Sequence, residues 1–139
     1  MYLLDTNVIA ELRAGKPKQS PAVRAWAARV AASQLYLSAV TVLEVEIGVQ
    51  RIERHDGAQG RTLRAWANEL RAQFASQILP YGEETARHCA AMHVPDPCSF
   101  RDSMIAATAR EHRLTLVTRN VSDFDGLDVH LLNPWETSP

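Results

Sequence analysis

Short apolar runs alternate with segments of helical periodicity along this chain. The runs that predict strands cover residues 2–4, 35–37, 78–79, 114–117 and 129–132. Between them, apolar residues recur three and four positions apart, which is the spacing of a helix with one buried face. Short strands alternating with helices predict parallel β-α units. We therefore expect an α/β fold, a three-layer α/β/α sandwich around a short, mostly parallel central sheet.

The predicted helices have recognisable start and stop signals. Ser20-Pro21 is a typical helix start, with a capping serine and a proline in the first turn. Ser99 has the same capping role before a later helix, and Pro95 and Pro97 end the helix that precedes it. The segments expected to be helical are residues 8–12, 21–30, about 40–52, 63–74, 83–93 and 99–112, with a polar turn at 55–60.

Length and composition restrict the kind of protein. A chain of 139 residues, 46% hydrophobic and 22% charged, is one domain's worth of globular protein, spanning 1–139. Its apolar runs are far shorter than the ~20 residues that cross a bilayer, and no basic stretch with an apolar continuation opens it. We expect a cytoplasmic protein that does not bind membranes, with Cys89 and Cys98 reduced.

Charge excludes some functions and leaves others to local patches. The net charge of −1 gives no overall attraction to nucleic acid, so any such role depends on a local site. Lys16 and Lys18 are the only lysines, and both come early, which excludes a phosphate-binding loop lysine. Arg61, Arg64 and Arg71 line one face of a predicted helix, which is either solvated or a contact for RNA or a partner protein.

Four carboxylates are expected near one edge of the predicted sheet. Asp5 follows the first strand directly, and Asp123 lies a few residues beyond the strand at 114–117. Glu44 falls in the first turns of the helix after the second strand, and Asp102 in the first turn of the helix that Ser99 begins. Each alone has an ordinary explanation as a helix cap, turn residue or solvated position. Together they predict a ligand site, because parallel sheets place such sites beyond their carboxyl ends.

Crowded carboxylates require a cation, because burying each carboxylate without a partner of opposite charge costs several kcal/mol. Arg119 is the one basic residue that we assign to these corners. The ligands are all oxygens, which favours Mg²⁺ or Mn²⁺ over zinc. Such an ion suits hydrolysis of a phosphodiester bond.

Four segments of the chain resemble the motifs of PIN-domain ribonucleases, and more narrowly the VapC and FitB-like toxins of bacterial toxin–antitoxin pairs. They are LLDTNVI at 3–9, LSAVTVLE at 37–44 with Gly48, RDSMIAATA at 101–109 and LVTRNVSDF at 116–124. The ending LNPWE at 132–136 is also similar to that subgroup. The likeness covers the chain in order, and Ser103 stands where alanine is frequent.

The resemblance implies a single PIN domain that acts as a metal-dependent endoribonuclease toxin. It assigns catalysis and metal binding to Asp5, Glu44, Asp102 and Asp123, and a surrounding polar role to Asn7, Thr118 and Asn120. Glu46 is a second acid within the Glu44 motif. We favour Glu44 as the site residue, because Gly48 lies one turn above it on the same helix face.

The same resemblance implies several partners. They are an RNA substrate such as tRNA or rRNA, a second copy of the chain in a homodimer, and a cognate antitoxin. Promoter DNA would be bound only indirectly, through the antitoxin. The sequence alone does not identify the RNA or the antitoxin.

Alternative functions remain open from sequence. One is a dimeric co-repressor partner of a DNA-binding antitoxin, with little or no catalysis. Phosphoryl transfer on Asp5 is disfavoured, because Asn7 stands where a second aspartate is usual and no late lysine follows. His88 and Cys89 are adjacent and point about 100° apart on a helix, which disfavours zinc. Trp26 and Trp66 lie on apolar stripes and are expected in the core.

Overall fold

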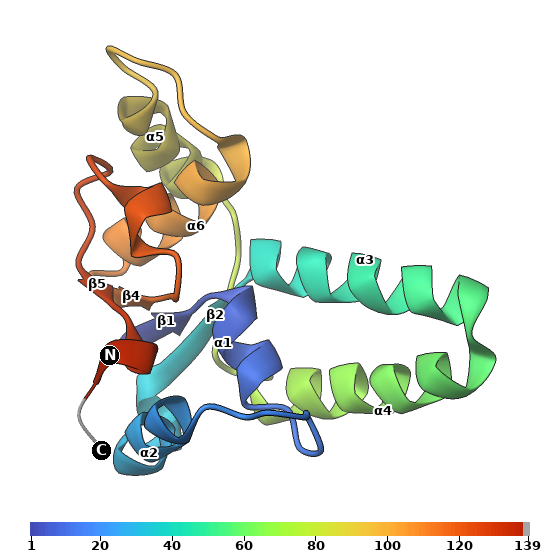
Figure 1. Ribbon diagram of the computed structural model, residues 1–139. Coiled ribbons are helices and arrows are strands. Elements are labelled where there is room, and N and C mark those ends of the chain that lie inside the picture. The colour runs from blue at the N-terminus through green and yellow to red at the C-terminus, as the bar shows by residue number, and fades with distance from the viewer. Residues whose placement is uncertain (138–139) are drawn as a thin grey trace.

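The computed structural model describes residues 1–137, and its centre is a five-stranded parallel sheet (Figure 1). The strands are β1 (Tyr2–Leu4), β2 (Leu35–Ser38), β3 (Ile78–Leu79), β4 (Thr115–Val117) and β5 (Leu131–Leu132), in the order β3-β2-β1-β4-β5. Every pairing is parallel. The predicted α/β sandwich with a short parallel sheet is confirmed.

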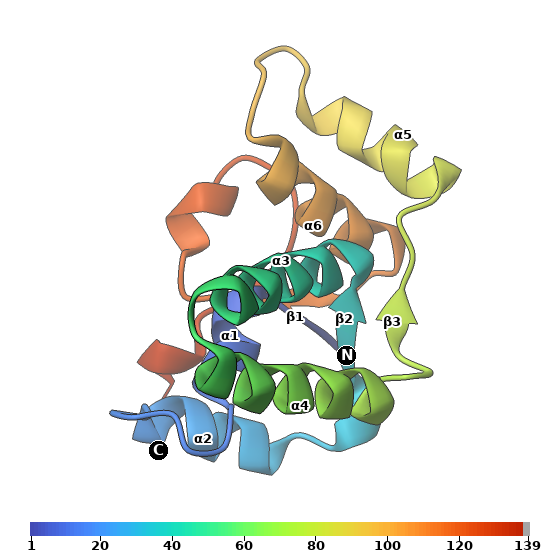
Figure 2. The ribbon, with the colours of Figure 1, turned by 90° about the vertical axis from the view of Figure 1, so that its right-hand side faces the viewer.

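Helices cover both faces of this sheet. They are α1 (Thr6–Glu11), α2 (Pro21–Arg29), α3 (Ala39–His55), α4 (Gly57–Gln73), α5 (Glu83–Met92) and α6 (Phe100–Glu111). In Figure 1, α5 and α6 lie above the sheet and α1, α2 and α4 lie below it. Figure 1 shows α3 and α4 as a long helical hairpin that reaches beyond the sheet, and Figure 2 shows the two helices side by side.

Alternating strand residues separate two hydrophobic cores. Leu3 and Leu116 belong to the core beneath α5 and α6, together with Ile105 and Phe124. Their chain neighbours Leu4 and Val117 belong to the other core, which α1, α2, α3 and α4 cover. This alternation follows from the period of two in a strand, and it explains why the strands are apolar on both faces.

Polar caps start the helices where the sequence predicted them. The Ser20 hydroxyl accepts a hydrogen bond from the Val23 N–H, and the Ser99 hydroxyl accepts one from the Asp102 N–H. The prediction of a polar turn over 55–60 is wrong, because only Asp56 lies between the two helices. Asp56 ends α3 and its side chain accepts from the Gln59 N–H, so residues 57–60 already form the first turn of α4. The last strand is also shorter than predicted, since residues 129–130 lie outside it.

Close packing and ion pairs hold the α3–α4 hairpin together. A Cβ atom at Gly60 would lie 2.7 Å from the Glu53 Cα atom, so only glycine allows this approach of the two helices. Arg64 of α4 forms ion pairs of 2.8 Å with Glu46 and with Glu53 of α3. Part of the arginine face of α4 therefore has a structural role.

The strand order fixes where a site can form. β1 lies at the centre of the sheet, with β2 and then β3 added on one side and β4 and then β5 on the other. The crevice beyond the carboxyl ends of β1 and β4 is therefore the switch point at which open α/β sheets bind ligands. No helix within the described residues 1–137 is long and apolar enough to cross a membrane.

Candidate functional site

Asp5 is the most deeply buried carboxylate of the predicted site. It directly follows β1, and its backbone N–H donates to the Val117 carbonyl of β4 at 2.9 Å. Its side chain is 0% exposed and caps α1 by accepting from the Thr6 N–H at 2.7 Å. The other carboxylate oxygen accepts from the Thr118 hydroxyl at 2.8 Å. Asp5 is therefore a helix cap and a site residue at once, with fixed orientation.

Glu44, rather than Glu46, faces Asp5. Ser38 caps α3 at the end of β2, which places the second turn of that helix above the sheet edge. Glu44 Oε1 accepts from the Thr6 hydroxyl at 2.6 Å, whereas Glu46 points to Arg64. A Cβ atom at Gly48 would meet nothing within 4 Å, so the space above Glu44 is open.

Arg101 joins three of the predicted carboxylates. Its Nη2 donates to Asp5 Oδ1 at 2.7 Å and to Glu44 Oε1 at 2.8 Å. Its Nε donates to Glu44 Oε2 at 2.8 Å, and its Nη1 donates to Asp102 Oδ1 at 3.0 Å. One guanidinium thus brings together side chains from the end of β1, from α3 and from α6. Fork-shaped arginine is suited to such bonding, since it presents several donors in one plane.

Ion pairing at the site favours the charged form of each partner. Burial by itself would raise the pKa of Glu44, but hydrogen bonds from Arg101 and Thr6 outweigh it and lower that pKa below 4.5. Burial would likewise lower the pKa of Arg101, but its bonds with Glu44 and Asp5 outweigh burial and raise it. Glu44 and Arg101 are therefore both charged at neutral pH.

The polar residues expected around the acids have unequal roles. Thr118 is 0% exposed and binds Asp5 directly. Asn7 contacts Asp5 only through Thr118, because its Nδ2 donates to the Thr118 hydroxyl across 3.5 Å. Asn120 is exposed and reaches Thr118 through its backbone N–H, at 3.1 Å.

Asp123 is not one of the carboxylates that Arg101 joins. It is exposed in a short 3-10 helix (Val121–Phe124), and its backbone N–H donates to the Asn120 carbonyl at 3.0 Å. Within residues 1–137 its side chain forms no ion pair with Arg101, which binds the other three acids.

The expectation that Arg119 is the basic residue at these corners is wrong, because Arg101 has that place. Arg119 instead lies over the Trp135 ring, with its guanidinium carbon 5.1 Å from the ring centre. Thr6 was also missed, although it directly follows Asp5. The signal for Arg101 was its position beside Asp102 in the first turn of a helix, where both side chains can reach the same sheet edge.

Ser103 anchors α6 beneath the site. It is 0% exposed, and its hydroxyl oxygen lies 2.8 Å from His93 Nε2 and accepts from the Cys89 thiol at 3.3 Å. Cys89 is buried in the core of α5 and α6. This small polar cluster fixes α6, and with it Arg101 and Asp102, against α5.

The carboxylate oxygens of the site are of the type that binds a hard divalent cation, but in this structure they surround Arg101. Asp5, Glu44 and Asp102 offer carboxylate oxygens alone, which is the ligand chemistry of Mg²⁺ and Mn²⁺. Yet among residues 1–137 no three Asp, Glu, His or Cys side chains lie close enough together, as they stand, to share one metal ion. The oxygens that would bind an ion face the guanidinium instead.

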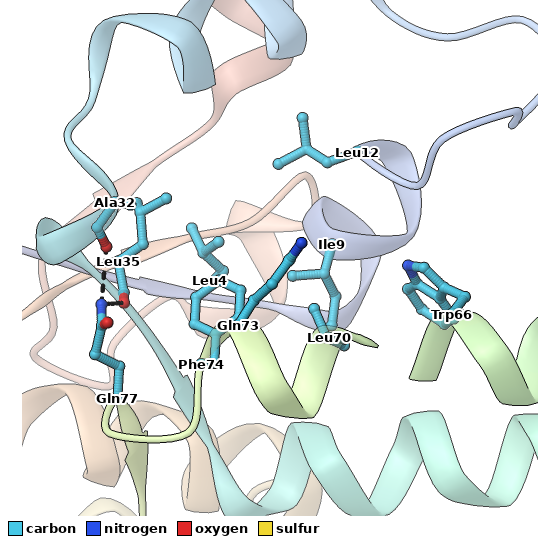
Figure 3. Close-up of a pocket in the computed structure, with 10 residues that line it drawn as sticks. All are labelled: Leu4, Ile9, Leu12, Ala32, Leu35, Trp66, Leu70, Gln73, Phe74 and Gln77. Atoms are coloured by element: carbon cyan, nitrogen blue, oxygen red, sulfur yellow. Dashed lines mark hydrogen bonds between the residues drawn. The ribbon is translucent and has the colours of Figure 1, made fainter. Parts of the chain in front are cut away.

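A second feature is an apolar pocket on the opposite face of the sheet from α5 and α6. Figure 3 shows it between α1, the end of α4 and the segment before β2, with a volume of about 420 Å³. Gln77 closes one end, donating to the Ala32 and Leu35 carbonyls at 2.8 and 2.5 Å. Trp66, expected in the core, is half-buried on its wall. The lining residues are Leu4, Ile9, Leu12, Ala32, Leu35, Trp66, Leu70, Gln73, Phe74 and Gln77.

Comparison with protein families gives a match to the PIN domain over residues 2–128. The chain belongs to the PIN-domain family. The matched range includes all three acids that meet at Arg101, as well as Asp123. The match confirms the family suggested by the sequence motifs.

Individual PIN-domain relatives match almost the whole chain. Toxin FitB of Neisseria gonorrhoeae is 36% identical, with 97% of this chain and 99% of that protein covered. VapC ribonuclease Y4jK of Sinorhizobium fredii is 32% identical, with coverage of 98% and 99%. The crystal structure of FitAcB from Neisseria gonorrhoeae matches with a TM-score of 0.89 and 35% identity, over 99% of this chain and 100% of that one. A structure of FitAB bound to an IR36 DNA fragment also gives a TM-score of 0.89, at 34% identity, with coverage of 100% of this chain and 99% of that one.

Proposed function

We propose that this PIN-domain protein is the toxin of a type II toxin–antitoxin pair and an endoribonuclease that hydrolyses RNA. The main support is that Arg101 brings together carboxylates from three separate elements at the switch point of the sheet, and that Asp5 is fully buried among them. A fold does not keep such a costly cluster for stability alone. Its relatives include a VapC ribonuclease and toxin FitB, which match the chain from end to end.

We assign metal binding to Asp5, Glu44 and Asp102, with Asp123 as a fourth, more exposed carboxylate. A bound Mg²⁺ or Mn²⁺ ion supplies Lewis acidity and an activated water for phosphodiester hydrolysis. The protein's own contribution is orientation. Thr118 and the Thr6 N–H fix the Asp5 carboxylate, and the Thr6 hydroxyl fixes Glu44, so two of the three acids are oriented at the sheet edge before a cation binds.

The first experiment is cleavage of a mixed tRNA and rRNA pool by the purified chain without antitoxin. Reactions with Mg²⁺, with Mn²⁺ and with EDTA are compared for the natural chain, Asp5→Asn and Asp102→Asn. We expect discrete cuts that need the metal and disappear in both variants. Glu46→Gln is the matched control, because it neutralises a carboxylate of the same motif that binds Arg64 outside the site.

Two outcomes would contradict the assignment. Unchanged cleavage by Asp102→Asn would remove Asp102 from the catalytic site. No cuts with either metal, from a folded protein, would favour the co-repressor function, in which the chain serves its antitoxin without catalysis. Asp5→Asn is then expected to bind antitoxin as well as the natural chain does.

We propose that the antitoxin inserts apolar side chains into the pocket of Figure 3. The pocket is lined mostly by apolar side chains, and none of its lining residues belongs to the acidic cluster. Interfaces gain most of their affinity from apolar anchors in such pockets. Leu12→Glu is expected to weaken binding of the cognate antitoxin by about tenfold or more, measured by titration calorimetry. Val94→Glu, an equal change at an exposed position outside the pocket, is the control.

We also propose that the protein acts as a homodimer. Leu43 and Ile47 are 55% and 41% exposed, one helical turn apart on α3, and covering such a pair is favourable. Light scattering is expected to give twice the monomer mass of 15.5 kDa. Leu43→Glu is expected to shift that mass toward the monomer if α3 forms the interface.

A further inference from the structure

Arg101 occupies the place where the proposed function requires a divalent cation. Three of its nitrogens donate to three carboxylates, at distances of 2.7 to 3.0 Å. Nη2 alone is shared by Asp5 Oδ1 and Glu44 Oε1. The cluster of three acids and one arginine keeps a formal charge of −2, so it stays attractive to a cation.

The same oxygen atoms serve both partners. Asp5 Oδ2 is already bound to the Thr118 hydroxyl, so Oδ1 is the atom that faces the cluster, and Arg101 holds it. Both oxygens of Glu44 accept from Arg101. As they stand, no three acidic side chains in the described part of the chain are grouped closely enough to hold an ion. Because Arg101 holds the oxygens that face the cluster, a divalent ion has to displace the guanidinium and draw the carboxylates closer together.

Displacement is sterically possible because the Arg101 side chain has an open path to solvent. The residue lies in the first turn of α6, and its side chain is 35% exposed, whereas Asp5 is 0% exposed. Asp5 and Glu44 are held by Thr6 and Thr118 independently of Arg101, whereas the Asp102 carboxylate is bound by Arg101 itself. The arginine can thus leave toward solvent while Asp5 and Glu44 keep their bonds to the two threonines.

We propose that Arg101 is an internal cation that stabilises the acidic cluster of the metal-free protein and competes with the divalent ion for it. This inference rests on the metal-binding role proposed above. Because the ion binds only when Arg101 has left, its apparent affinity is reduced by the fraction of molecules in which the arginine occupies the cluster. Arg101 is a positioning residue that sets the metal concentration at which the site becomes loaded.

The test is Mn²⁺ binding by titration calorimetry to the natural chain, to Arg101→Gln and to Arg119→Gln, without RNA. We expect Arg101→Gln to bind Mn²⁺ about tenfold more tightly, because the competing state is gone. Arg119→Gln removes the same charge from an arginine at the same edge that packs on Trp135, and is expected to change the affinity less than about twofold. Arg101→Gln is also expected to unfold at lower temperature without metal, and to gain more in melting temperature from Mn²⁺ than the natural chain gains.

A second measurement uses the natural chain and does not depend on folding of the variant. The Nε–H of Arg101 donates to Glu44, so its signal in a ¹⁵N spectrum reports this contact. We expect the signal to shift and broaden by exchange with solvent as Mg²⁺ is added.

The outcomes separate this inference from the nuclease assignment. Equal or weaker Mn²⁺ binding by Arg101→Gln, an Arg101 signal that does not change while Mg²⁺ binds, or no binding of metal by any variant would each overturn it. If Arg101→Gln binds Mn²⁺ more tightly but no RNA is cut, the nuclease assignment fails and the competition stands.

Discussion

Thr118 donates its hydroxyl proton to Asp5 Oδ2 across 2.8 Å, on the oxygen that Arg101 does not bind. The bond joins the end of β4 to the end of β1 and is fully buried. Asp5 Oδ2 is therefore held by Thr118, whereas Oδ1 accepts from both the Thr6 N–H and Arg101. Both groups follow adjacent parallel strands, so strand pairing itself brings them together.

The first prediction concerns this bond. Thr118→Val keeps the shape of the side chain but leaves a buried carboxylate oxygen without a donor, which costs about 1–3 kcal/mol. We expect a loss of that size in the free energy of unfolding, measured by urea denaturation, together with slower RNA cleavage. Thr118→Ser retains the hydroxyl and is expected to remain close to the natural chain in both. Equal behaviour of the two variants would show that the hydroxyl has no role.

The second prediction concerns two glycines of the α3–α4 hairpin that differ in their surroundings. At Gly60 a Cβ atom would lie 2.7 Å from the Glu53 Cα, whereas at Gly48 it would meet nothing within 4 Å. Gly60→Ala is expected to destabilise the fold by about 1–3 kcal/mol through overpacking against backbone. Gly48→Ala is expected to stabilise it by up to about 1 kcal/mol through helix propensity. Urea unfolding of both variants provides the comparison, and stabilisation by Gly60→Ala would contradict the close helix approach.

Sequence predicts the site as far as local rules extend. The strand ends and helix starts are local features, so Asp5 and Glu44 could be placed at the sheet edge before the fold was known, whereas no strand directly precedes the helix of Asp102. Gly48 distinguished Glu44 from Glu46, because helical spacing alone determines which residues share a face. The family motifs then identified the same acids.

The role of Arg101 could not be predicted in this way. Its partners Asp5 and Glu44 lie 96 and 57 residues away along the chain, and the contact depends on how a long side chain crosses between three elements. The pocket beside Trp66 could not be predicted from the sequence for the same reason. An apolar stripe predicts burial, but whether the neighbouring elements close over it is decided by tertiary packing.

The third prediction is a pH dependence that arises from Glu46. Hydrogen bonds from Arg64 and Gln50 hold the pKa of Glu46 at about 2 in the folded chain, below its ordinary 4.5. Because the folded pKa is the lower one, the stabilisation is complete above pH 4.5 and is lost as the pH falls toward 2. Glu46→Gln is therefore expected to lose stability less steeply than the natural chain between pH 4.5 and pH 2.

Urea midpoints at several pH values measure this slope. Glu44 also has a lowered pKa, so the Glu46 variant keeps part of the acid sensitivity. Glu69→Gln is the control, because Glu69 is exposed on α4 and forms no ion pair within residues 1–137. A Glu46 variant with the slope of the natural chain would show that the pair with Arg64 does not contribute to stability.

The last prediction decides the place of Asp123. Its exposed carboxylate does not contact Arg101, so it acts on a bound ion only through a charge screened by solvent. We expect Asp123→Asn to weaken Mn²⁺ binding by less than about tenfold, and the loss to shrink as salt is added. Asp102→Asn removes a carboxylate that reaches the cluster directly, and is expected to weaken binding by roughly 10–100-fold at any salt concentration. Titration calorimetry at two ionic strengths distinguishes the two cases. Equal, salt-independent losses would mean that Asp123 binds the ion directly once Arg101 has left, and that the 3-10 helix which carries it moves toward the cluster.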